Sequence, residues 1–142
     1  MFDELKKYKS NNHFPLLPNG NLEKVCNAPK TGCGVYLVFA LKKGKIDLVY
    51  IGSSGKIQNN GTLKQRIGGL YDRIVNGYQF GKIPRKISWI QKIKKEGIDG
   101  LDIYWYETFN EEIKDIPAFT EAILIQRYFD INLRLPSWNN EF

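Results

Sequence analysis

The chain has 142 residues, which suits one compact domain, because two half-sized domains would each bury too little apolar surface. Its hydrophobic content of 42% argues against intrinsic disorder, and the absence of a run of about 18 apolar residues argues against a membrane span. The net charge of +6 is compatible with a polyanionic partner such as nucleic acid.

Residues 1–33 are expected to form a lead-in that packs on the core. A short amphipathic piece is followed by the stretch FPLLPNGN, whose proline, asparagine and glycine content favours irregular structure. The charged start, MFDELKKYKSNN, lacks the apolar segment of a signal peptide, so we expect a cytoplasmic protein.

Residues 34–142 carry the patterns of a single folded domain that begins with a hairpin. Residues 34–40 and 46–52 are rich in β-branched and aromatic side chains. They flank Lys-Lys-Gly-Lys, a sequence typical of a turn. These two segments therefore predict adjacent antiparallel strands.

Two helices, a strand and a last helix are predicted after the hairpin. The first helix is expected to start at Thr62, an N-cap residue followed by apolar residues at helical spacing. A second helix is expected from Pro84, a third strand over residues 101–108, and a last helix near Pro117. This β-β-α-α-β-α order predicts an α+β fold, in which helices flank a small three-stranded antiparallel sheet.

The few nitrogen and sulfur ligands limit the metal chemistry that the chain can support. A tetrahedral zinc site needs about four such ligands, and the sequence offers Cys26, Cys33 and His13. We interpret the cysteines as free thiols in a reducing cytosol and the histidine as incidental. A catalytic metal would then be held by oxygen atoms, which favours Mg²⁺ or Mn²⁺.

Four side chains are candidates for chemistry, although each also has an ordinary structural explanation. Tyr36 and Tyr50 lie in adjacent predicted strands, where tyrosine pairs commonly pack together. Arg66 borders the apolar stripe of the predicted helix, so its guanidinium either extends to solvent or binds a phosphate. Glu121 shares the apolar face of the last helix, where it either benefits from the helix dipole or finds an arginine, a hydrogen-bond network or a metal.

The order of these residues resembles that of the GIY-YIG nuclease superfamily. Gly34-Val35-Tyr36 precedes Tyr50-Ile51-Gly52, an arginine lies on the next predicted helix, and a glutamate lies on the last one. Pro136-Ser137-Trp138-Asn139 completes the set, so the resemblance covers nearly the whole chain beyond the lead-in, as a stand-alone catalytic domain.

The sequence departs from the family pattern in three places. Val35 replaces the isoleucine of the first motif, and the segment between Tyr50 and Arg66 is several residues longer than is common. Many members carry a histidine or tyrosine about one helical turn after the arginine. Here Tyr71 lies one step beyond that position, so either Gly68-Gly69 shifts the register or the role is absent.

The resemblance implies a metal-dependent endonuclease that hydrolyses DNA phosphodiester bonds by water attack at a single-metal site. Glu121 would hold one Mg²⁺ or Mn²⁺ ion, and Arg66 would neutralise charge on the phosphate. Tyr36 or Tyr50 would orient or deprotonate the attacking water. A non-cleaving nucleic-acid-binding module on the same scaffold is the alternative.

Further residues would assist this chemistry. The family's late asparagine matches Asn139, with Asn132 as a competing alignment. Because the ordinary pKa of tyrosine is about 10, a tyrosine base needs a nearby cation. Lys56 and Lys64 are candidates for that cation, although solvated surface lysines are the common case.

A basic group near the start of the middle helix predicts contacts with DNA phosphates. It comprises Lys82, Arg85 and Lys86, close to several aromatic residues. No helix-turn-helix, zinc-finger or homeodomain pattern accompanies it. We therefore expect specificity to come from a homodimer, a partner protein or elaborations of the core.

Overall fold

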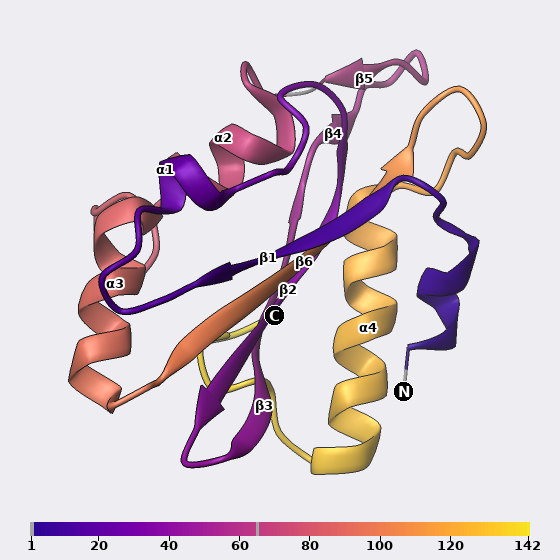
Figure 1. The fold of residues 1–142 in the computed structure, drawn as a ribbon. Helices are drawn as coiled ribbons and strands as arrows, with labels where there is room; N and C mark the ends of the chain where they lie inside the picture. Colours follow the sequence, from indigo (N-terminus) through magenta and orange to yellow (C-terminus); the bar gives the residue numbers. More distant parts are fainter. Residues whose placement is uncertain (1, 65) are drawn as a thin grey trace.

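The computed structural model describes residues 2–64 and 66–142, and these form an α+β fold (Figure 1). The main sheet is antiparallel with the strand order β1-β6-β2-β3, and a separate ribbon pairs β4 with β5. The α+β class is thus confirmed, whereas the predicted three-stranded sheet is wrong because the sheet has four strands. In chain order the elements are η1 (Asp3–Lys7, a 3-10 helix), β1 (Asn11–Leu16), α1 (Leu22–Val25), β2 (Cys33–Lys42), β3 (Lys45–Ser54), β4 (Lys56–Ile57), β5 (Leu63–Lys64), α2 (Gly69–Asn76), α3 (Arg85–Glu96), β6 (Gly100–Phe109) and α4 (Pro117–Asn132).

The predicted hairpin is confirmed as β2 and β3. Its strands extend to Lys42 and Lys45, which face each other across the turn. The two turn residues, Lys43 and Gly44, have φ values of 51° and 76°. Two consecutive left-handed residues match the right-handed twist of the strands, which is why such tight turns connect hairpins.

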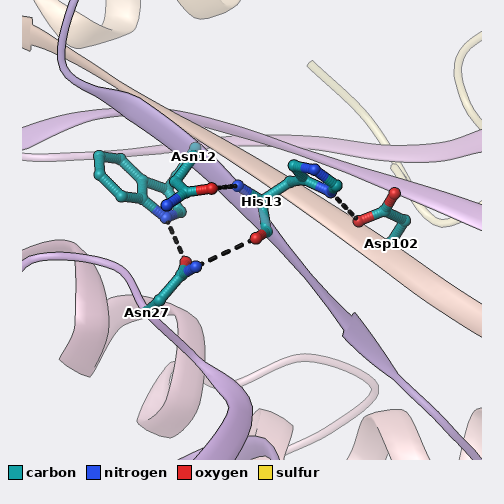
Figure 2. A network of polar contacts seen from close by, with 5 residues as sticks. Asn12, His13, Asn27 and Asp102 are labelled. Carbon is teal, nitrogen blue, oxygen red and sulfur yellow. Dashed lines mark hydrogen bonds and ion pairs between the residues drawn. The ribbon is translucent and has the colours of Figure 1, made fainter.

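The fourth strand, β1, comes from the lead-in and includes the start of the FPLLPNGN stretch, which was predicted to be irregular. Strand β1 pairs with β6 at the edge of the sheet, where Pro15 is tolerated because no neighbour needs its missing N–H. Figure 2 shows how side chains also join the two strands: Nδ1 of His13 lies 2.9 Å from Oδ1 of Asp102. The Asn27 carboxamide donates to the His13 carbonyl (3.0 Å) and accepts from the Trp105 indole (2.8 Å). The lead-in (residues 1–33) and the predicted domain (residues 34–142) therefore both contribute strands to the same sheet.

The first predicted helix starts later than expected. Helix α2 begins at Gly69 instead of Thr62, and the ribbon formed by β4 and β5 occupies the preceding segment. The apolar spacing was misleading there, because the side chain of Ile67 is 96% exposed. The later predictions are confirmed: α3 ends before Gly97, and β6 and α4 lie where the sequence placed them.

Helices cover both faces of the sheet (Figure 1). Tyr36 and Val38 face a core that includes the buried residues of α2 and α3. Val35 and Leu37 face a second core built with α4 and η1, as expected from the alternation of side chains along a strand. Within the described residues, no helix is both long and apolar enough to cross a bilayer.

Candidate active site

Tyr36 and Tyr50 pack side by side on the face of the sheet that α2 and α3 cover. Their ring centroids are 6.0 Å apart, with Tyr36 fully buried and Tyr50 half-buried. Gly52 provides the space, because a Cβ there would lie 2.6 Å from Cζ of Tyr36 and 2.7 Å from Cε2 of Tyr50. Gly34 is equally constrained, since its Cβ would lie 1.8 Å from the carbonyl oxygen of Tyr106. Gly52 therefore allows the two tyrosine rings to pack together, and Gly34 allows β6 to approach β2 closely.

Arg85 contacts both tyrosines from the first turn of α3. Its guanidinium carbon lies 5.5 Å from each ring centroid, and its Nη2 donates to the Tyr50 hydroxyl at 3.4 Å. Nε donates to Oε1 of Gln79 (2.9 Å) and Nη1 to the carbonyl of Arg73 (2.7 Å). The side chain is 1% exposed, so it does not belong to the exposed basic surface on which we predicted DNA contacts.

Arg73 is the helical arginine that faces the tyrosines. It lies on α2, and its pKa is raised mainly by the neighbouring Tyr36, with further contributions from Tyr50 and Glu121. Nε of Arg73 and the Tyr36 hydroxyl are buried and have no hydrogen-bond partner within the described residues. The Tyr36 hydroxyl is nevertheless close enough to Arg73 to raise the pKa of its guanidinium. Unpaired buried polar atoms are rare in proteins and are expected where a polar ligand binds.

Arg66, the predicted catalytic arginine, lies before α2 and is exposed. Gly68 and Gly69 adopt left-handed φ values of 89° and 57°, which keeps the preceding residues out of the helix. The Arg66 side chain forms an ion pair with Asp72. The structure therefore does not bring Arg66 to the tyrosines. Sequence reasoning missed Arg73, although its place between Leu70 and Ile74 at helical spacing indicates the edge of the buried face.

Glu121 reaches the edge strand of the sheet from α4. Its Oε1 accepts a 2.8 Å hydrogen bond from the Ser53 hydroxyl on β3. Burial raises the pKa of Glu121 above its ordinary value, and the Ser53 hydrogen bond and the charge of Arg73 offset part of that increase. Alternation along β3 places Ser53 on the α4 side of the strand and Tyr50 on the other side. The candidate site therefore has residues on both sides of β3, with Ser53 and Glu121 on one side and Tyr50 on the other.

A basic pocket of about 520 Å³ lies where the two sides meet, beyond the end of β3. Arg73 from α2 and Ala118 from α4 both line it, and Ser53 connects it to Glu121. Four of its lining side chains are basic and none is acidic. These charges suit a phosphate group, which guanidinium and ammonium groups bind well. The lining residues are Ser53, Ser54, Gly55, Lys56, Lys64, Arg66, Arg73 and Ala118.

A second pocket, of about 480 Å³, lies between η1 and the face of the sheet that α4 also covers. Its lining is mostly aromatic and aliphatic, and includes Phe39, Tyr104 and Tyr106 but no carboxylate. It contains none of the predicted site residues, so the basic pocket is the better candidate for phosphate chemistry.

Asn139 is engaged with the backbone of β3. Its carboxamide accepts from the Ile51 N–H and donates to the Ile51 carbonyl, at 3.0 Å each. The competing Asn132 donates to the Tyr128 carbonyl at the other end of α4, about 16 Å from Glu121 along the helix axis. The structure thus places Asn139 next to the site and Asn132 away from it.

The remaining predicted residues divide between the pocket and the surface. Lys56 and Lys64 line the basic pocket. The Tyr71 hydroxyl donates to the Glu23 carbonyl at 2.7 Å, so it points toward the lead-in and away from the other tyrosines. Lys86 lies 3.9 Å from the Glu23 carboxylate, and Lys82 is exposed.

Glu121, which Ser53 links to the basic pocket, is the candidate oxygen ligand for a hard cation, although it is not itself one of the lining residues. Residues 2–64 and 66–142 contain no cluster of three or more histidine, cysteine, aspartate or glutamate side chains placed to share an ion. Mg²⁺ needs only one or two carboxylates when phosphate and water oxygens complete its shell, and Glu121 supplies one. Cys26 and Cys33 are buried free thiols whose pKa burial raises to about 11, so they are not thiolate ligands at neutral pH.

Comparison with protein-family models finds no matching family for this chain, and neither curated proteins nor solved structures give a match.

Proposed function

We propose that this chain is a metal-dependent endonuclease that hydrolyses DNA phosphodiester bonds by water attack, as its resemblance to GIY-YIG nucleases implies. The supporting observation is the position of Glu121 beside a pocket lined by four basic side chains. Burial disfavours the charged form of this carboxylate, as its raised pKa indicates. A buried carboxylate weakens binding of an anion unless a cation lies between them. A module that only bound DNA would have no use for it.

Arg73 takes the phosphate-binding role that the sequence assigned to Arg66. It lines the pocket, faces Tyr36 and Glu121, and has a buried Nε without a partner in the described structure. A guanidinium fixed in that position neutralises charge that develops on the phosphate. Arg66 contributes to the field of the pocket while its side chain stays paired with Asp72.

Glu121 is the residue that would hold one Mg²⁺ or Mn²⁺ ion, with Ser53 fixing the orientation of its carboxylate. When bound, the ion polarises the scissile phosphate and stabilises the leaving oxygen. The half-buried position of Glu121 limits competing water and keeps the carboxylate in one orientation.

Tyr50 is the tyrosine that would orient the attacking water. It is half-buried, whereas Tyr36 is fully buried and positions the Tyr50 ring. Burial raises the pKa of Tyr50 to about 12, with a further increase from Tyr36 that Arg85 and Arg73 oppose. Its hydroxyl therefore stays protonated at neutral pH and serves as a hydrogen-bond donor.

Plasmid nicking with Mg²⁺ or Mn²⁺ tests the proposal. Glu121→Gln and Arg73→Ala should each reduce cleavage by about 10²–10³-fold, the loss typical of removing one charge-stabilising group. The exposed Glu112→Gln is the control and should cleave within a few fold of the wild type. Arg66→Ala should lose less cleavage than Arg73→Ala, because the Arg66 side chain is paired with Asp72.

The outcome also separates the two functions. If the wild type binds duplex DNA but leaves plasmid intact with both metals, the chain is a binding module. If Arg66→Ala and Arg73→Ala lose cleavage in the opposite order, the assignment of the phosphate-binding arginine is wrong.

A further inference from the structure

The ribbon of β4 and β5 projects past the end of β3 beside the basic pocket (Figure 1). Its two strands pair Lys56 with Lys64 and Ile57 with Leu63. Gly55 fixes its base, because a Cβ at that position would lie 2.2 Å from Cβ of Cys33 on β2. The base is thus packed tightly against the sheet, while Gly61, Thr62 and Leu63 near the tip share a shallow pocket with residues 109–111 and Lys114 of the β6–α4 connection.

The two faces of the ribbon differ in chemistry. Ile57 and Leu63 are half-buried, whereas the side chains of Lys56 and Lys64 are exposed and lie directly opposite each other. Like charges in opposed positions of an antiparallel pair are destabilising. Both lysines also line the pocket that contains Arg73. An anion bound along this face would remove the repulsion, so the arrangement suits a polyanionic backbone.

The tip of the ribbon is polar and held in shape by its own side chains. The Thr62 hydroxyl lies 3.0 Å from Oε1 of Gln58 and 2.6 Å from Oδ1 of Asn60. The backbone N–H of Gln58 donates to the Thr62 carbonyl at 2.8 Å. Asn59 is exposed at the apex. An asparagine carboxamide can pair with the edge of an adenine in the major groove.

We propose that the β4–β5 ribbon inserts into the major groove of duplex DNA and positions the adjoining backbone at the basic pocket. The inference rests on the proposed function, and it adds the form of the substrate and the element that grips it. A two-stranded ribbon fits the major groove, which is about 12 Å wide. Lys56 and Lys64 contact phosphates, while Asn59 contacts base edges.

The chain provides a matched control for the lysine pair. Lys42 and Lys45 also face each other across a hairpin, but they lie at the β2–β3 turn, at the opposite end of the molecule (Figure 1). We would measure binding of the wild type, Lys56→Gln/Lys64→Gln and Lys42→Gln/Lys45→Gln to a mixed-sequence duplex over a range of KCl concentrations. The same measurements would use one strand of that duplex alone.

The ribbon variant should lower the slope of log affinity against log salt by about 1 for each lysine, while the control pair leaves it unchanged. The loss of affinity should be larger for the duplex than for the single strand. The proposal would be overturned if the two double variants had equal slopes of log affinity against log salt. It would also be overturned if the ribbon variant lost equal affinity for the duplex and for the single strand. Asn59→Ala should change the sequences that the protein selects from a randomised duplex pool, and an unchanged selection removes base contact from the proposal.

These experiments distinguish a failure of the ribbon proposal from a failure of the proposed nuclease function. An inactive wild type that still shows the ribbon-specific change in slope contradicts the nuclease function and retains the ribbon proposal. An active wild type whose slope does not respond to Lys56→Gln/Lys64→Gln contradicts the ribbon proposal and retains the nuclease function. Unfolding temperatures of both variants should match or exceed that of the wild type, because each substitution removes a like-charge pair.

Discussion

Asn139 pairs with the backbone of Ile51 as a strand residue would, accepting one hydrogen bond and donating another, each 3.0 Å long. The neighbouring Trp138 N–H donates to the Val49 carbonyl at 2.8 Å. The C-terminal segment thus covers the free edge of β3 on both sides of Tyr50. Covering an edge strand satisfies its backbone groups and fixes its position. Asn139 therefore acts on the candidate site through the strand that carries Tyr50.

Asn139→Ala should lower the free energy of unfolding by about 1–3 kcal/mol, because two hydrogen bonds to backbone groups are lost. Urea denaturation measures this change. Asn132→Ala removes one hydrogen bond at the other end of α4 and should cost less. If the Asn132 variant were the less stable of the two, the role assigned to Asn139 would be contradicted.

Glu121→Gln should raise the unfolding temperature at neutral pH in the presence of a chelator. Burial raises the pKa of Glu121 in the folded protein above its ordinary value of 4.5. The contribution of this group to stability is therefore fully present below pH 4.5 and is lost as the pH rises through the folded pKa. The difference between wild type and variant should therefore vanish in acid. Thermal unfolding between about pH 4 and 7 tests this sign.

Added Mg²⁺ or Mn²⁺ should raise the unfolding temperature of the wild type and leave that of Glu121→Gln unchanged. An ion that binds the folded protein stabilises it in proportion to the logarithm of its concentration above Kd. Ser53→Ala should weaken the response, because the Glu121 carboxylate loses its 2.8 Å hydrogen bond. Equal responses from wild type and Glu121→Gln would rule out Glu121 as the ligand.

Arg85→Met should destabilise the protein by about 1–3 kcal/mol in total, because a fully buried side chain loses its hydrogen bonds to Oε1 of Gln79 and to the Arg73 carbonyl. Both acceptors keep a second donor, the Trp89 indole and the Gly77 N–H respectively, so neither is left unpaired. Arg127→Ala is the control, since its exposed ion pair with Glu4 is worth about 0–1 kcal/mol. Chemical denaturation of both variants measures the contrast, and similar losses would contradict the buried role of Arg85.

Asp115→Asn should reduce the loss of stability in acid. The Lys7 ammonium and the Tyr8 hydroxyl bind this carboxylate and hold its pKa below 3.8 in the folded protein. The contribution of Asp115 to stability is therefore fully present above pH 3.8 and is lost as the pH falls through its lower pKa in the folded protein. Acid unfolding curves of wild type and Asp115→Asn should differ at neutral pH and converge near pH 2.

Sequence patterns predicted the elements whose ends are set by nearby residues in the chain, such as the helices bounded by a glycine or a proline. Gly97 has a left-handed φ of 65° and ends α3, and Pro117 starts α4. Position 85 shows the limit of such patterns. Its burial depends on Gly77, where a Cβ would lie 2.2 Å from Nη1 of Arg85, and on two tyrosines from distant strands. Composition alone places an arginine at the surface.

The candidate site was predictable to the same extent. Glu121, Tyr36 and Tyr50 could be selected because apolar neighbours or strand pairing predict where they point. Arg66 was selected in place of Arg73 because Leu63 and Ile67 have helical spacing, whereas Leu63 lies in the ribbon and Ile67 lies before α2 and is exposed. A two-stranded ribbon of two-residue strands leaves almost no periodic signal.

The pairing of β1 with β6 has a consequence for synthesis of the chain. Asn11 lies opposite Tyr106 and Leu16 opposite Leu101, so this seam joins segments about ninety residues apart in sequence. A nascent chain on the ribosome cannot close it until β6 has emerged, and until then β1 has no strand to join. Such non-local closure is slow and leaves strand edges available to other chains. Strand β1 therefore stays without its sheet partner until about three quarters of the chain has left the exit tunnel.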